Sequence, residues 1–204
     1  VSLPGRESLL VAHYSFLIPA KPQPIHIAHF ATWATGKKVV WRTSFPAILA
    51  NKDAHGSGTL TPTILEGGSY GIYWYGSGAP NYYEDKTIIS NNQFKDQYYM
   101  GISLYYQNNL IADRNTFSSS STYSYFYPVY CNYVNKKSRF TSNKINTGNT
   151  GGYGIYLYGC NGNGDSILVA NNMISTGGSY GTNNIYLYSC SYVHTINKIG
   201  RAHV

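Results

Sequence analysis

The sequence predicts an all-β solenoid, in which the chain winds through about five stacked coils of short parallel strands. Two short elements recur in the same order along residues 61–198. The recurring strands alternate apolar residues and tyrosines with a period of two, which is the period of a β-strand. The same stretch is rich in Tyr, Gly, Asn and Ser and carries no helical stripe of apolar residues.

The first recurring element is an apolar-x-apolar triplet. Its copies begin at successive spacings of 30, 27, 26 and 30 residues, at Ile72, Ile102, Val129, Ile155 and Ile185. The second element is Asn-x-apolar and follows each triplet, beginning at Asn92, Asn115, Asn143, Asn172 and Asn197. A period in the twenties, with loops of variable length, is typical of one solenoid coil.

The strand motif "IYLY" predicts an inside and an outside. Because successive side chains point to opposite faces, Ile155 and Leu157 share one face and Tyr156 and Tyr158 share the other. Stacked coils would bury a continuous column of Ile, Leu and Val while pairing in parallel about 4.8 Å apart.

Composition and charge narrow the class of protein. A chain of 204 residues can bury one sizeable core as a single domain. No run of about 20 apolar residues exists, so the sequence predicts no membrane-spanning helix. The net charge is +7, yet the only basic cluster is "KKSR" at 136–139, which we interpret as a solvated loop. We therefore predict no nucleic-acid binding, while a weakly acidic glycan partner stays open.

The domain organisation changes near residue 60. Of 22 tyrosines only Tyr14 precedes residue 61, whereas four of the six histidines lie before it. Residues 61–198 form the repeat region, and residues 1–60 are a capping segment, a separate region or a frame-shifted translation of further repeats. Residues 6–20 have a faint signal-peptide outline that His13 and Tyr14 interrupt, so we do not interpret them as a signal.

Two stretches resemble known sequences. "GIYLYGC…SILVANNMI" resembles a coil of the right-handed parallel β-helix repeat proteins, the pectin-lyase-like superfamily, and the likeness spans residues 68–198. The resemblance implies a right-handed parallel β-helix, a secreted or cell-surface location, and an amide ladder formed by Asn92, Asn115, Asn143, Asn172 and Asn197. The third coil departs from the pattern, with Pro128 in place of Gly and Cys131 in place of Leu.

The C-terminal "IGRAHV", residues 199–204, is similar to a translated sequencing adapter. We interpret it as an adapter-derived tail.

The acidic residues do not stack into a catalytic site. Lyases and hydrolases with this fold gather acids from neighbouring coils, either around Ca²⁺ or as an acid–base pair. Asp85 and Asp165 share a position within the coil, but three coil rises separate them by about 14 Å. We predict no catalytic residue, no metal and no cofactor. "HGSG" at 55–58 is only weakly similar to a hydrolase "GHG".

The cysteines allow two interpretations. Cys160 and Cys190 each follow their strand isoleucine by five residues, so they should stack on consecutive coils. A disulfide stays open, but parallel Cβ vectors favour two buried thiols in an inner column. The spacing of the three cysteines fits no zinc site.

The outward tyrosines are the candidate binding residues. One predicted row holds Tyr73, Tyr130, Tyr156 and Tyr186, interrupted by Ser103; the second holds Tyr75, Tyr105, Tyr158 and Tyr188, interrupted by Asn132. Such rows suit stacking on sugar rings or contact with a protein. The simpler interpretation is that neighbouring rings stack on each other and stabilise the sheet.

The predicted function is accordingly a non-catalytic, secreted or surface β-helix that binds a polysaccharide or a cell-surface protein through the tyrosine rows. The alternative is a fragment of a carbohydrate-active enzyme, a polysaccharide lyase or glycoside hydrolase, that lacks its catalytic coils. Fold resemblance does not choose between them, because function lies in the site.

Overall fold

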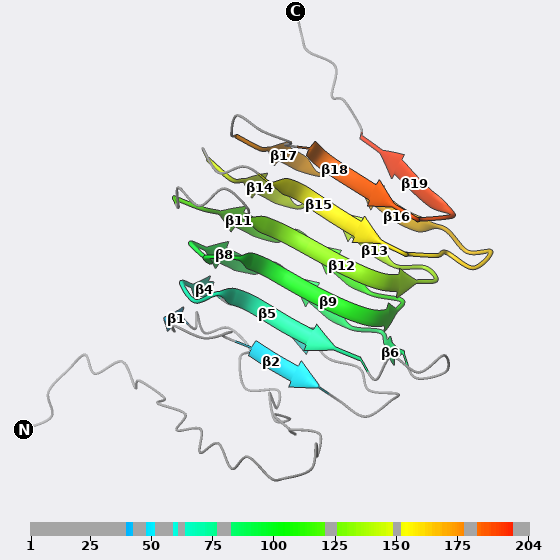
Figure 1. Ribbon diagram of the computed structural model, residues 1–204, viewed down its shortest axis with the longest axis horizontal. Helices are drawn as coiled ribbons and strands as arrows, with labels where there is room; N and C mark the ends of the chain where they lie inside the picture. Colours follow the sequence, from blue (N-terminus) through cyan, green and yellow to red (C-terminus); the bar gives the residue numbers. More distant parts are fainter. Residues whose placement is uncertain are drawn as a thin grey trace, which may run out of the picture.

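The chain winds as a parallel β-solenoid whose strands stack into three sheets (Figure 1). The computed structural model describes residues 40–42, 48–51, 59–60, 64–76, 83–120, 126–148, 152–177 and 183–197. Within these ranges every strand pairing is parallel, and none of the residues forms a helix long and apolar enough to cross a membrane. The predicted all-β solenoid is confirmed.

Each coil contributes one strand to each sheet, in a constant order. Sheet 1 contains β2 (Ile48–Asn51), β5 (Tyr70–Tyr75), β9 (Met100–Asn108), β12 (Tyr127–Asn135), β15 (Tyr153–Tyr158) and β18 (Asn183–Tyr188), with β6 (Glu84–Asp85) beside β9. Sheet 2 contains β3 (Thr59–Leu60), β7 (Ile88–Ser90), β10 (Ile111–Asp113), β13 (Arg139–Thr141), β16 (Ile167–Ala170) and β19 (Val193–Ile196). Sheet 3 contains β1 (Val40–Arg42), β4 (Ile64–Glu66), β8 (Gln93–Lys95), β11 (Thr116–Ser118), β14 (Lys144–Asn146) and β17 (Met173–Ser175).

The predicted apolar column forms the inner wall of sheet 1. The first residues of the five triplets pair in register from coil to coil, and four of them are buried: Ile72, Ile102, Val129 and Ile155. Ile185 continues the column and is half-buried. Pro128 and Cys131 leave the register of the third coil unchanged, because Val129 pairs with both Ile102 and Ile155.

The other two sheets close the core with larger side chains. Phe94 and Phe117 of sheet 3 stack with their ring centroids 4.7 Å apart. They lie so close to sheet 1 that a Cβ on Gly101 would be 2.7 Å from a ring carbon of Phe117. Glycine before the strand isoleucine therefore lets sheets 1 and 3 approach each other.

The turn from sheet 2 to sheet 3 has the same backbone in four coils. Its first residue lies in the left-handed region at φ of 52–59°, at Asn91, Arg114, Ser142 and Asn171. A buried asparagine follows it at once in each coil. Arg and Ser seldom adopt this conformation, so the neighbouring coils impose it.

Strand pairing extends into the segment before residue 61. The backbone of β2 pairs with β5 and places Ile48 opposite Ile72, while β1 and β3 pair with β4 and β7. Residues 6–20, "HGSG" at 55–58 and the tail at 199–204 lie outside the described residues.

Candidate functional site: the tyrosine surface

The first predicted tyrosine row lies on the outer face of sheet 1. Strand register places Tyr130, Tyr156 and Tyr186 side by side on β12, β15 and β18. The Tyr130 and Tyr156 rings stack with centroids 4.9 Å apart and planes 13° apart, and Tyr156 stacks on Tyr186 at 5.2 Å and 24°. Stacking turns the ring faces toward one another, so edges and phenol tips face outward.

Ser103 interrupts this row in sequence, but the ring contacts continue across it. The Tyr105 ring lies 5.9 Å from Tyr73 and 6.2 Å from Tyr130, measured between centroids. Ser103 itself is fully buried, although it occupies an outward position. Tyr105 therefore fills the space that a ring at position 103 would occupy.

The second predicted row is interrupted at Asn132. Tyr75 contacts Tyr105 at 4.9 Å, and Tyr158 stacks on Tyr188 at 5.4 Å. Two tyrosines that sequence analysis missed bridge the interruption: the Tyr106 and Tyr133 rings stack at 5.2 Å and 4°, and they contact Tyr75 and Tyr158 respectively. Both residues have positive φ inside β9 and β12, which interrupts the alternation of side chains at that point of each strand.

A third row was also missed. Tyr70, Tyr99, Tyr127 and Tyr153 lie at the start of the sheet 1 strands, and Tyr127 stacks on Tyr153 with centroids 5.5 Å apart. The sequence does contain a signal for this row, because Tyr70, Tyr127 and Tyr153 each lie three residues before a tyrosine of the first row. We name the whole set the tyrosine surface: Tyr70, Tyr73, Tyr75, Tyr99, Tyr105, Tyr106, Tyr127, Tyr130, Tyr133, Tyr153, Tyr156, Tyr158, Tyr186 and Tyr188.

The tyrosine surface carries no formal charge on its strands. β5, β9, β12, β15 and β18 contain no Asp, Glu, Lys, Arg or His. Desolvation by burial, followed by neighbouring tyrosines, raises the pKa of Tyr127 to about 12 and raises the pKa of Tyr105 as well. The phenols of Tyr105 and Tyr127 therefore stay neutral near pH 7 and are available to donate and accept hydrogen bonds.

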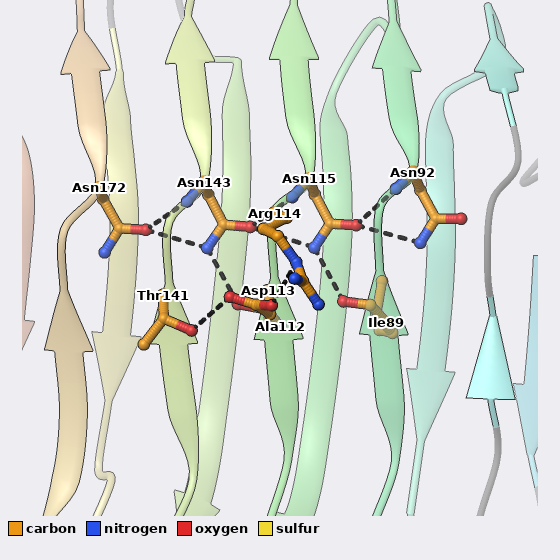
Figure 2. A network of polar contacts seen from close by, with 9 residues as sticks. All are labelled: Ile89, Asn92, Ala112, Asp113, Arg114, Asn115, Thr141, Asn143 and Asn172. Atoms are coloured by element: carbon orange, nitrogen blue, oxygen red, sulfur yellow. Dashed lines mark hydrogen bonds and ion pairs between the residues drawn. The ribbon is translucent and has the colours of Figure 1, made fainter.

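Four of the predicted ladder asparagines form a continuous row inside the turn between sheets 2 and 3 (Figure 2). The Nδ2 of Asn115 donates to Oδ1 of Asn143 at 3.1 Å, and Nδ2 of Asn143 donates to Oδ1 of Asn172 at 3.0 Å. Each of these oxygens also accepts the backbone N–H of the preceding coil's asparagine. Asn197 is exposed and is not joined to Asn172 by these bonds.

A comparison with family models identifies the architecture. Residues 46–197 match the model described as the right-handed β-helix region. The chain belongs to this family. No curated protein and no solved structure matches the chain significantly.

The four aspartates in the described part of this β-helix are held in separate local contacts. Asp85 accepts a hydrogen bond from Asn109, Asp96 accepts two from Ser120, and Asp165 pairs with Lys137 at 3.5 Å. Asp113 accepts from Thr141 and pairs with Arg114 at 2.8 Å (Figure 2). Within the described ranges, no three His, Cys, Asp or Glu residues group as metal ligands would.

The basic cluster "KKSR" lies at the turn between β12 and β13. The side chains of Lys136, Lys137 and Arg139 are exposed, whereas Ser138 is buried and donates to the Asn135 carbonyl at 2.6 Å. Its hydroxyl oxygen also accepts the backbone N–H of Leu110 at 3.0 Å. The buried serine therefore fixes the turn, and the three cationic side chains remain exposed, with Lys137 beside Asp165.

The three cysteines of the β-helix are free thiols. Cys131 lies in the inner column between Leu104 and Leu157, and Cys160 is buried near the end of sheet 1. Cys190 occupies the corresponding place on the next coil but is only half-buried.

Proposed function

We propose that this β-helix is a non-catalytic, secreted or surface protein that binds a neutral polysaccharide along the tyrosine surface. The proposal rests on two features that occur together on sheet 1. Tyrosine rings are contiguous over five strands, and those five strands contain no charged residue. A ligand for such a surface is extended, uncharged and rich in hydroxyl groups.

Ring geometry favours a glycan over a protein partner. A protein interface gains most from burying large apolar faces of tyrosine and tryptophan. Here Tyr156 is stacked between Tyr130 and Tyr186, which covers both faces of its ring and one face of each neighbour. The ring edges and phenol groups of this stack can hydrogen-bond to sugar hydroxyls and contact their C–H groups.

The sequence-based expectation of flat aromatic faces for sugar stacking is therefore modified. Hydrogen bonding from successive phenols, about one per coil rise of 4.8 Å, replaces face stacking as the principal interaction. Because no ion pair takes part, the affinity should be nearly independent of salt.

The test is calorimetric titration of the purified chain with a panel of neutral and acidic polysaccharides. We expect binding to neutral polymers, an affinity unchanged between low and high salt, and loss of binding in the double variant Tyr156→Ser/Tyr186→Ser. The matched control is Tyr192→Ser, which removes a 61% exposed tyrosine from the turn after β18 and should leave binding unchanged.

Three outcomes would overturn the proposal. Unsaturated or reducing-end products released from a polysaccharide by clean protein would establish an enzyme. Binding only to acidic polymers, abolished by salt, would place recognition on the basic residues. No heat with any glycan, together with capture of a protein partner that the double variant loses, would make the surface a protein interface.

A further inference from the structure

Cys160 and Cys190 occupy equivalent positions on consecutive coils, just beyond β15 and β18. The backbone N–H of Ser191 donates to the Cys160 carbonyl at 3.0 Å, and Asn161 and Ser191 form a parallel bridge. In-register neighbours in a sheet lie about 4.8 Å apart, inside the Cα separation of about 4.4–6.8 Å that disulfides span. The Cα separation therefore fits a disulfide, and a small backbone shift must bring the parallel Cβ atoms closer before the bond can form.

The two thiols differ in surroundings and contact each other. Cys160 is fully buried, and its sulfur accepts the backbone N–H of Val134 at 3.4 Å. Cys190 is half-buried, and as a thiol it donates to the Leu157 carbonyl at 3.3 Å. The hydrogen bond from Cys160 lowers the pKa of Cys190 to about 7; the same bond, followed by burial, raises the pKa of Cys160.

The difference in exposure and pKa is the one expected between an attacking thiol, here Cys190, and a resolving thiol, here Cys160. The partly accessible Cys190 has the lowered pKa and the buried Cys160 beside it has the raised one, so Cys190 is the thiol of the pair that loses its proton first. Cys131 provides an internal contrast, since it is fully buried in the apolar column and burial raises its pKa.

We propose that Cys190 is a site of oxidation by peroxides and that Cys160 resolves the product into a disulfide between consecutive coils. The Cys190 thiolate attacks one oxygen of hydrogen peroxide, the O–O bond breaks, and after protonation the products are Cys190 sulfenic acid and water. The Cys160 sulfur then attacks the Cys190 sulfur, the S–O bond breaks, and a second water leaves. Two thiols lose two electrons and one peroxide gains them.

The disulfide would join the coils of β15 and β18. It closes the loop from residue 160 to residue 190 in the unfolded chain, so it should raise the melting temperature of the oxidised protein. The step requires each sulfur to leave its carbonyl acceptor, Tyr158 for Cys160 and Leu157 for Cys190.

The test uses the full chain, reduced and folded, treated with one equivalent of hydrogen peroxide and then alkylated in denaturant, so that every remaining thiol, including the buried Cys131, can react. We expect two of the three thiols to escape alkylation and mass spectrometry to find the 160–190 cross-link, with a mass loss of two hydrogens. In Cys160→Ser, the sulfenic acid on Cys190 should persist and be trapped by dimedone. In Cys131→Ala, the cross-link should form as in the original chain.

Three results would overturn the proposal. Equal oxidation of all three cysteines, or oxidation only in denaturant, would show that Cys190 is not a distinct site. Dimedone labelling of Cys190 in the original chain, without any cross-link, would show that Cys160 does not resolve it. Both measurements on the original chain stand even if a serine variant fails to fold, which circular dichroism reveals.

Discussion

The rings of Tyr130 and Tyr156 stack face to face, 4.9 Å apart, while the residues that precede them, Val129 and Ile155, pair inside the core. One strand pair thus carries an aromatic stack on its outside and an apolar contact on its inside. The two layers make separate and unequal contributions to stability.

Replacement of Ile155 by Asp should unfold the neighbouring coils. Ile155 is fully buried, so Ile155→Asp places an unpaired carboxylate in the core and should lower the free energy of unfolding by more than about 4 kcal/mol. Tyr156→Ser loses ring contacts only and should cost about 1–2 kcal/mol. Chemical denaturation that finds equal losses would refute the inside–outside assignment.

The asparagine ladder should be sensitive to a single deletion. Asn143→Ala removes the acceptor for two donors of Asn115 and the donor to the Ala112 carbonyl, which should cost about 3 kcal/mol. The matched control is Asn197→Ala, an exposed asparagine of the same sequence motif, with an expected change within about 0.5 kcal/mol. Urea denaturation followed by circular dichroism compares the two variants. Similar urea midpoints for both would show that the ladder does not stabilise the fold.

The left-handed turn residue Ser142 provides a backbone test. Ser142 is exposed and has a φ of 55°, which glycine adopts freely and β-branched residues resist. Ser142→Gly should be neutral or stabilising by up to about 1 kcal/mol, whereas Ser142→Val should destabilise by about 1–2 kcal/mol. Thermal melts of the pair measure the difference, and a valine variant as stable as the glycine variant would contradict the turn geometry.

Alkaline pH should destabilise the β-helix through the tyrosine surface. The pKa of Tyr127 is raised to about 12 by burial and then by its tyrosine neighbours, so the folded state retains a proton that the unfolded state releases near pH 10. The stability that is linked to the protonated phenol of Tyr127 is fully present below pH 10 and is lost as the pH rises toward 12. Denaturation midpoints across that range should fall while tyrosine ionisation is followed by absorbance. A constant midpoint, with all tyrosines titrating together near pH 10, would contradict it.

The inner wall was predictable because its signal is local. The alternation of Ile155, Tyr156 and Leu157 depends only on strand geometry, and it gave the coil register even across Pro128. The left-handed turn residues were not predictable, because Arg114 and Ser142 have no preference for that conformation and adopt it only within stacked coils.

The candidate site was predicted in outline but not in detail. The rows of Tyr156 and Tyr158 followed from the alternation of the strand. The position of Tyr105 did not, because Tyr105 occupies space that is open only because Ser103, at the first-row position, has no ring. Likewise Tyr106 and Tyr133 joined the surface only because positive φ interrupts the alternation of side chains at that point of each strand.

The ladder of asparagines has a direction. Asn115 and Asn143 each present a backbone N–H and an Nδ2–H to the following coil, and one side-chain oxygen on that coil accepts both. If the coils fold in the order of synthesis, N-terminus first, the exposed edge of the growing ladder is the edge that carries the donors. In such an assembly each added coil up to that of Asn172 completes the edge with an amide oxygen, whereas the fifth coil stacks through β18 and β19 without Asn197 joining the ladder.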